Sequence, residues 1–203
     1  MPITDLDIFA ADDLVIRVLD GSELHLPKPS VRLMLAAFTF ERALQDAMTA
    51  GDDELASSLT IDILTRVLST NRERIAVDEE WMVAHGIIGD LAAVVYNTFA
   101  EHLHTLVDNP KLRLPSIPGG DDDDRDAPFM AQVGTVCDFA KVSIDAALDM
   151  ACDMFSACVK QAYINRMNES EGGRKYLADC ERLTKTEPDY DALRSLPGYR
   201  QEG

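Results

Sequence analysis

The stretch that decides the fold is residues 30–53, which read SVRLMLAAFTFERALQDAMTAGDD. It begins with Ser30, whose hydroxyl suits a helix N-cap, and it contains Gly51, which suits a helix end. Between them, apolar residues recur at helical spacing: Leu33, Leu35 or Ala36, Phe38, Phe40, Ala43 and Met48. The pattern predicts a helix over residues 31–50. Asp52 or Asp53 can cap a second helix over residues 54–69, whose apolar face comprises Leu55, Leu59, Ile63, Leu64, Val67 and Leu68.

Upstream of these helices, residues 14–26 have the pattern of a β-hairpin. Residues 14–19 are rich in β-branched side chains, and residues 23–26 alternate polar and apolar. Asp20 and Gly21 can supply a two-residue turn, because glycine tolerates a positive φ. Pro27 and Pro29 are expected to end the second strand, since proline has no N–H to donate. An isolated hairpin is marginally stable in water, so it is expected to pack on a helix or on another chain.

Downstream, Asp78 is expected to begin a third helix over residues 79–107. Its first turn carries Glu79 and Glu80, which the helix dipole favours at that end. Gly86 and Gly89 are the positions at which this helix can bend or break. Its apolar residues follow helical spacing through Trp81, Ile88, Leu91, Ala92, Val95, Phe99 and Leu106.

The chain is expected to divide at residues 109–128, a linker rich in proline, glycine and aspartate. Its prolines oppose a helix and the run Asp121–Asp124 repels itself, so the linker is expected to be extended and mobile. The predicted organisation is therefore a β-hairpin with a helical body (1–108), the linker (109–128) and a C-terminal unit (129–203).

The C-terminal unit is expected to begin with one long amphipathic helix over residues 129–168. Apolar residues recur there at threes and fours, and aspartates line the opposite side. Shorter helices are expected over residues 175–184 and 188–196. The fold class predicted for the whole chain is mainly α, with a short N-terminal β-hairpin, a helical bundle, a long C-terminal helix and a short helical tail.

Composition excludes several classes of function. The 203-residue chain carries 36 acidic and 19 basic residues, a net charge of −17, so phosphate backbones and anionic membranes are expected to repel it. No apolar run is long enough for a transmembrane helix, and the first residues do not resemble a signal peptide. The four cysteines have no paired or zinc-finger spacing and are expected to be reduced core residues. These features favour a cytoplasmic protein.

Few side chains could bind a metal ion or act in catalysis, and each has a simpler structural interpretation. His102 and His104 are two residues apart, so on a helix they do not face one metal ion. The run Asp121–Asp124 lacks the pattern of a calcium loop and is better explained as a solvated linker. The cysteines lie on or near an apolar stripe, where thiols are unreactive. No phosphate-binding loop, dinucleotide fingerprint or nucleophile elbow is present. We expect no catalytic, cofactor-binding or metal-binding residues, and hence no enzyme.

The long C-terminal stripe is instead the candidate surface for binding protein. An apolar face of this length cannot remain in water, and its small residues allow another helix to approach closely. The expected occupant is a client helix or another copy of the chain, in preference to the chain's own body. Trp81 is either an aromatic anchor for a partner or a core residue, and its place early in an apolar helix favours the core. The candidate interaction residues are Trp81, Ala140, Ile144, Ala147, Leu148, Ala151 and Phe155.

Three stretches resemble the tail assembly chaperones of long-tailed phages, especially those of phages that infect actinobacteria. These stretches are the opening residues 4–9 with the β-hairpin and residues 26–29, the helical body 30–107, and the extension from residue 163, which includes residues 186–189 and 192–194. The resemblance implies a chaperone in the host cytoplasm. Such proteins coat the helical tape measure protein and recruit tail tube subunits before the tube polymerises.

Three other functions are compatible with the sequence. One is a structural virion protein, such as a head–tail connector or tail-terminator component. A second is an acidic DNA mimic, which needs carboxylates spaced like phosphates. The third is an enzyme. The chaperone hypothesis predicts that the gene lies just upstream of a very long open reading frame that encodes a coiled-coil protein.

Overall fold

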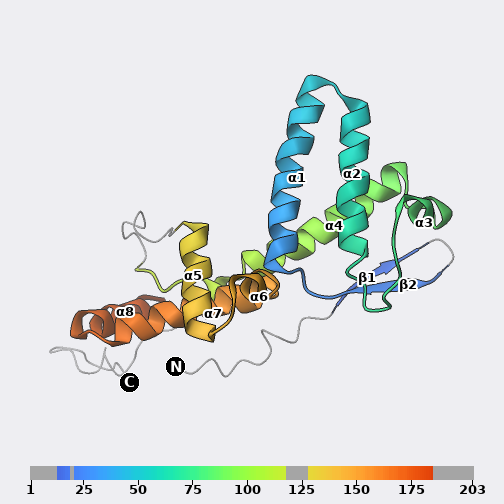
Figure 1. Cartoon of the computed structure of the whole chain (residues 1–203). Helices are drawn as coiled ribbons and strands as arrows, with labels where there is room; N and C mark the ends of the chain where they lie inside the picture. The colour runs from blue at the N-terminus through green and yellow to red at the C-terminus, as the bar shows by residue number, and fades with distance from the viewer. Residues whose placement is uncertain (1–12, 19–20, 118–127, 185–203) are drawn as a thin grey trace, which may run out of the picture.

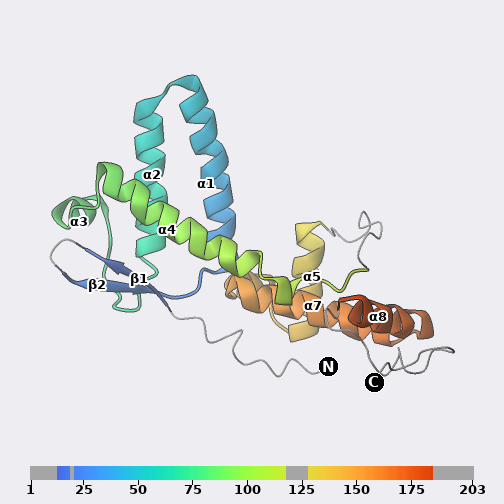
Figure 2. The same ribbon diagram turned by 180° about the vertical axis from the view of Figure 1, so that it is seen from behind.

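The computed structural model describes residues 13–18, 21–117 and 128–184 and shows a mainly helical, elongated protein. A β-hairpin and the short helix α3 (Glu79–Ala84) lie at one end, and helix α8 (Glu171–Thr184) lies at the other (Figure 1). Helices α1 (Val31–Ala50) and α2 (Asp53–Leu68) form a hairpin that projects from the middle. Helix α4 (Gly89–Val107) runs behind this hairpin, as the view from the back shows (Figure 2).

The two strands, β1 (Leu14–Arg17) and β2 (Glu23–Leu26), pair antiparallel with Arg17 opposite Glu23. The hairpin was predicted correctly. The Val18 N–H donates to the Ser22 carbonyl (3.0 Å) and the Gly21 N–H donates to the Val18 carbonyl (2.9 Å). Gly21 has a φ of 86°, which glycine adopts without steric cost, whereas Asp20, the other residue of the expected turn, lies outside the described residues.

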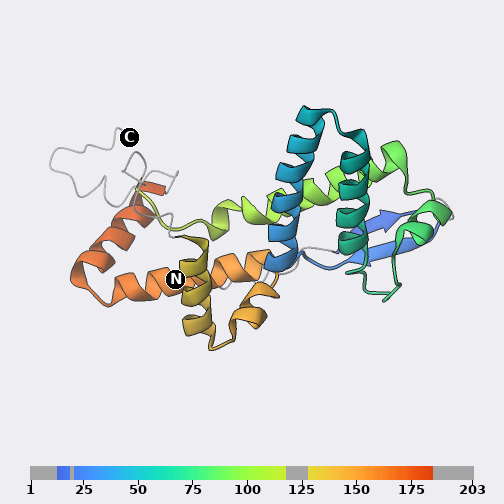
Figure 3. The ribbon, with the colours of Figure 1, turned by 45° about the horizontal axis from the view of Figure 1, so that its top comes forward.

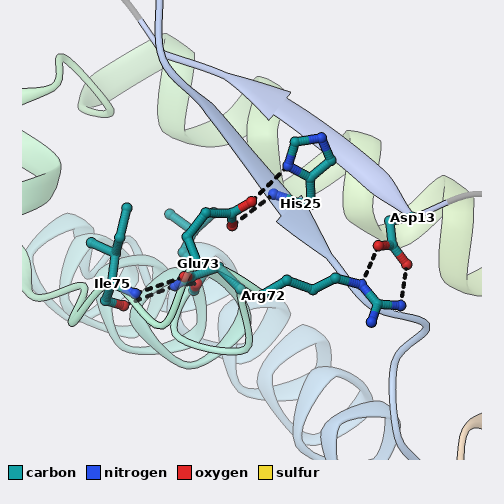
Figure 4. A network of polar contacts seen from close by, with 7 residues as sticks. Asp13, His25, Arg72, Glu73 and Ile75 are labelled. Carbon is teal, nitrogen blue, oxygen red and sulfur yellow. Dashed lines mark hydrogen bonds and ion pairs between the residues drawn. The ribbon is translucent and has the colours of Figure 1, made fainter.

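The hairpin is held against the loop that follows helix α2 by polar contacts (Figure 4). The His25 backbone N–H donates to Glu73 Oε2 (3.1 Å), while its Nδ1 lies 2.6 Å from Oε1. Arg72 pairs with Asp13, with Nη2 2.7 Å from Oδ1, and its backbone N–H donates to the His25 carbonyl (2.9 Å). The hairpin therefore packs on its own chain, one of the two arrangements that the sequence allowed.

Helices α1 (Val31–Ala50) and α2 (Asp53–Leu68) match the sequence prediction closely. The Ser30 hydroxyl accepts from the Leu33 N–H (3.2 Å), and Asp52 accepts from the Leu55 N–H (3.0 Å). Between them Gly51 adopts the left-handed conformation, with a φ of 70°, and its N–H donates to carbonyls of the last turn of α1. Local capping thus fixes both helices and the turn that reverses the chain.

The expected third helix is broken into α3 (Glu79–Ala84) and α4 (Gly89–Val107). Asp78 caps α3 as predicted, through the Trp81 N–H (2.8 Å). The break occurs at the two glycines that the sequence marked: Gly86 has a φ of 74° and Gly89 a φ of 51°.

The long helix predicted over residues 129–168 was wrong. The structure has three helices there, α5 (Phe129–Ala140), α6 (Ile144–Leu148) and α7 (Cys152–Asn168). Lys141 ends α5 in the left-handed conformation, with a φ of 57°, and Ser143 caps α6 through the Ala146 N–H (3.2 Å). The apolar spacing continues through these loops, which is why the pattern suggested one helix.

The break between α6 and α7 lies where the C-terminal helices join the body. The Val31 N–H donates to the Met150 carbonyl (2.9 Å), and the Cys152 N–H donates to the Pro29 carbonyl (3.0 Å). Ser30 and Ala151 form an isolated β-bridge between these two bonds. Backbone pairing with a distant segment thus interrupts the helix, and local sequence does not show such a partner.

Part of the expected linker is ordered and packed. Residues Pro110–Leu112 form a short 3-10 helix, and Leu112 is buried. Lys160 Nζ donates to the Lys111 carbonyl (2.5 Å), and the Tyr176 hydroxyl donates to the Pro115 carbonyl (3.4 Å). Residues 118–127, which include the aspartate run, and the helix expected over 188–196 lie outside the described residues. The division into three parts stays a prediction.

Helix α8 (Glu171–Thr184) follows α7 after a sharp corner, which is clearest with the top of the molecule turned forward (Figure 3). It begins four residues before the predicted 175–184. One cluster of buried apolar side chains extends from the β-hairpin through α1, α2 and α4 to α5, α6 and α7. The C-terminal helices therefore share a core with the body, and this shared scaffold positions the candidate site.

Candidate functional site

An apolar groove lies between the outer half of the α1/α2 hairpin, α3 and the start of α4. It encloses about 450 Å³. Its floor is buried and consists of Leu64, Met82, Ile87 and Ala92. We call this feature the groove; its lining residues are Leu44, Met48, Asp53, Ala56, Ser57, Thr60, Ile61, Leu64, Glu79, Met82, Val83, Ile87, Ile88, Gly89, Ala92 and Ala93.

The walls of the groove expose large apolar side chains to solvent. Met48 is 63% exposed, Val83 54% and Ile88 55%. These three come from α1, α3 and the turn before α4, so they are far apart in sequence but lie around one groove. Exposed apolar side chains that gather around a concave surface mark a site for an apolar partner, whereas scattered ones do not.

Local sequence explains why the groove is open. The glycines between α3 and α4 turn the chain so that Ile87 is buried (3% exposed) while the next residue, Ile88, is exposed. The α1/α2 hairpin projects from the middle of the molecule, and helix α4 crosses behind its inner half, so the outer end of the hairpin extends past α4 (Figures 1 and 2). The outer turns of α1 and α2 therefore leave apolar side chains uncovered.

The charge around the groove has one sign. The segments that form it contain no lysine or arginine between residues 43 and 65 or between residues 75 and 109. Asp53 and Glu79 line the groove and are exposed. The same segments carry further acidic residues: Asp46, Asp52, Glu54, Asp62, Asp78, Glu80, Asp90, Glu101 and Asp108. Apart from histidine, the charged side chains of these two segments are therefore all acidic, and two of them, Asp53 and Glu79, line the groove itself.

A second, smaller depression of about 380 Å³ lies on the same helical hairpin, lined by residues of α1 and α2 alone. Its apolar residues include Leu35, Phe40 and Leu59, and its rim carries both signs of charge, Asp62 and Arg66. These two side chains pair with each other (3.1 Å), so this depression has no net charge preference.

The interaction residues predicted from the sequence do not lie together on one surface of the structure. Ala147 is fully buried, and Phe155 is buried with its ring stacked on Phe129 at 6.0 Å. Ala140, Leu148 and Ala151 are half-buried, whereas Ile144 is 54% exposed. They do not form one stripe, because the helix is broken.

The apolar stripe of residues 129–168 was expected to bind a client or another copy of the chain in preference to the chain's own body. This expectation was wrong. Ala147 and Phe155 lie in the same buried cluster as the body residues, and α6 and α7 pack against α1. Arg32 at the start of α1 pairs with Asp149 (2.8 Å) and Asp145 (3.2 Å), which flank the buried Ala147. The stripe is covered within the chain because the bridge to Pro29–Val31 brings it there.

Trp81 lies on α3 but does not line the groove. Its ring stacks on His85 with centroids 3.9 Å apart, and it is half-buried against the core. The core interpretation of this residue, which the sequence favoured, matches its position.

The cysteine and histidine side chains that the sequence pointed to lie in positions that support the fold. Burial raises the pKa of the Cys152 thiol to about 12, with the adjacent Asp153 adding to the effect, and burial also raises that of Cys158. Protonated thiols are poor nucleophiles. His102 lies half-buried near Lys28 and Asp153, a buried ion pair that joins the β2–α1 loop to α7. Its Nε2 is buried and has no hydrogen-bond partner within the described ranges.

Sequence reasoning missed the groove. Met48 was assigned to the apolar stripe of the first helix, and Ile88 and Ala92 to that of the third, without any sign that they line one groove. A usable signal was present: the long absence of lysine and arginine over two segments that end up side by side. What the sequence did not show is that the outer turns of the α1/α2 hairpin extend beyond their packing partners.

No protein-family model, curated protein or solved structure matches this chain. No helix among the described residues has the length and apolar character needed to cross a membrane. Within residues 13–18, 21–117 and 128–184, no three His, Cys, Asp or Glu side chains gather so that they could hold a metal ion.

Proposed function

We propose that this chain is a non-enzymatic chaperone that binds another protein through the groove, in the manner of the phage tail assembly chaperones that its sequence resembles. The clients would be the tape measure protein, tail tube subunits or both, and the place of action the host cytoplasm. The observation that carries the proposal is the exposed apolar wall of Met48, Val83 and Ile88 above a buried floor.

The dimensions of the groove suit one face of a helix. Its lining residues on α2 run from Asp53 to Leu64, about 16 Å along a helix axis, or about three turns. A helix laid in such a groove presents apolar side chains at spacings of three and four. A tape measure protein exposes helical apolar surface until the tube encloses it, so it supplies this kind of ligand.

The rest of the molecule supports a holding function. The buried cluster joins the groove floor to the C-terminal helices, so the groove stands on a packed scaffold. The net charge of −17 favours solubility of a complex with an apolar client.

The test is co-expression with the proposed client, a tape measure protein that the proposal expects to be encoded just downstream of this chain. The groove variant is Met48→Lys/Val83→Lys, which places charges on two walls that are 63% and 54% exposed. The control is Met130→Lys/Ile144→Lys, whose residues are 64% and 54% exposed on α5 and α6. We expect the groove variant to reduce client binding by about tenfold or more, and the control to bind like the wild type.

Circular dichroism checks that both variants fold. Equal client binding by the groove variant and the wild type would contradict the proposal. Loss of binding in the control alone would move the interface to the C-terminal helices. A client that stays equally soluble without the chain would show that no chaperone is needed.

A further inference from the structure

We infer that the groove selects a cationic amphipathic helix, one whose apolar stripe is flanked by lysine or arginine. The inference rests on the proposed function and specifies its client. Shape alone does not set this preference, because any apolar helix of about three turns fits the lining. The preference comes from the charges around the groove.

The acidic rim belongs to the groove itself. Asp53, at the start of α2, and Glu79, at the start of α3, both line the groove and come from different helices. A helix lying between them would place the residues flanking its stripe beside these carboxylates. Opposite charges across an interface favour the correct partner and speed its association, and like charges reject the wrong one.

The groove-forming segments themselves carry no basic residue to offset this negative charge. No lysine or arginine occurs in either groove-forming segment, 43–65 or 75–109. Elsewhere the described chain does pair its charges, as in the Arg32 contacts with Asp145 and Asp149 and the Asp62–Arg66 pair at the rim of the second depression. The rim carboxylates of the groove lie exposed, where a partner's cations can reach them.

The same charges argue against a second copy of the chain as the occupant. Two copies joined groove to groove would bring two acidic rims together without a basic residue from either groove-forming segment. Like charges that meet across an interface oppose association, so a groove-to-groove dimer is disfavoured. The occupant that we infer is a different protein, with the opposite charge.

The test uses the full chain and three labelled peptides of about 14 residues. The first has leucines at helical spacing (i, i+3, i+4, i+7) flanked by lysines. The second has glutamate in place of every lysine. The third has the composition of the first in a scrambled order that has no stripe. Fluorescence anisotropy measures the affinity of each peptide at low and high salt.

We expect the lysine-flanked peptide to bind about tenfold or more tightly than either of the others. High salt should weaken it, because salt screens exposed charges. Asp53→Asn/Glu79→Gln should weaken it about threefold, as expected for losing two exposed charge pairs. The matched control, Asp138→Asn/Glu169→Gln, neutralises exposed acids outside the groove and should bind like the wild type.

Each of three results would overturn the inference. Equal binding of the lysine and glutamate peptides would show that the groove has no charge preference. Equal binding of the scrambled peptide would show attraction to net charge alone. A dimer of the chain that Met48→Lys/Val83→Lys converts to monomer would show that a second copy is the occupant. Any of these can occur while the tape measure test succeeds, so failure of the inference is distinguishable from failure of the function.

Discussion

Single residues allow the chain to turn between helices, and Gly173 is the clearest example. It lies in the first turn of α8, where the chain turns back from α7, and it is buried. A Cβ atom at this position would overlap the backbone carbonyl of Met167. Gly172, its neighbour, has open space around the same position. Only one of two adjacent glycines is therefore required by packing.

The two glycines should respond oppositely to alanine. Gly173→Ala should lower the free energy of unfolding by about 2 kcal/mol, because the new methyl group meets backbone that cannot move aside easily. Gly172→Ala should raise it by about 0.5–1 kcal/mol, because alanine favours the helix. Urea denaturation of both variants measures the difference. Equal effects would mean that α8 does not approach the end of α7 as described.

His102 predicts how stability depends on pH. Burial lowers its pKa, nearby Lys28 lowers it further, and Asp153 opposes them. In the unfolded chain the imidazole has a pKa of about 6.5, so below that pH the unfolded state binds more protons than the folded state. Stability should therefore fall as the pH drops from 7.5 to 5.5.

The measurement is urea unfolding at these two pH values. His102→Leu should reduce the loss of stability, because it removes the group that takes up the proton on unfolding. His104→Leu is the control, since that residue lies on the same helix with its side chain 55% exposed. If His102→Leu leaves the loss unchanged, the pH dependence arises elsewhere.

At the scale of elements, the helix ends that were predicted correctly are those set by local capping residues. The bounds of α1 and α2 follow from Ser30, Gly51 and Asp52, whose hydrogen bonds are local and therefore readable from the sequence. The α3–α4 break follows from its two glycines. The helix predicted over 129–168 failed for the opposite reason: one break is a lysine in a glycine-like conformation, and the other is a backbone pairing with residues 29–31.

Lys141 gives a test of the first break whose sign is decisive. If α5 ends there with a φ of 57°, Lys141→Gly should stabilise the protein by about 1 kcal/mol, because glycine adopts this conformation without steric cost. The melting temperature should rise by about 2–4 °C. Within a continuous helix the same change would destabilise by a similar amount. Lys175→Gly, inside α8, is the control and should destabilise.

At the scale of the whole molecule, the sequence predicted the fold class and the first elements, but neither the breaks in the C-terminal helices nor the candidate site. The groove combines Met48 and Ile88, which belong to two separate helical patterns, with Val83, which neither pattern includes. Their exposure depends on where three helices stop covering one another, which is a property of packing. Charge was the exception, because a segment without lysine or arginine is visible in the sequence.

The most direct test of the central claim, that the groove is the protein-binding site, is hydrogen–deuterium exchange of the chain with and without its proposed client, a tape measure protein. We expect slower exchange on binding in residues 43–64 and 79–93, with little change in α5 and α6. Protection confined to residues 129–155, or no protection in the groove segments despite a stable complex, would contradict it.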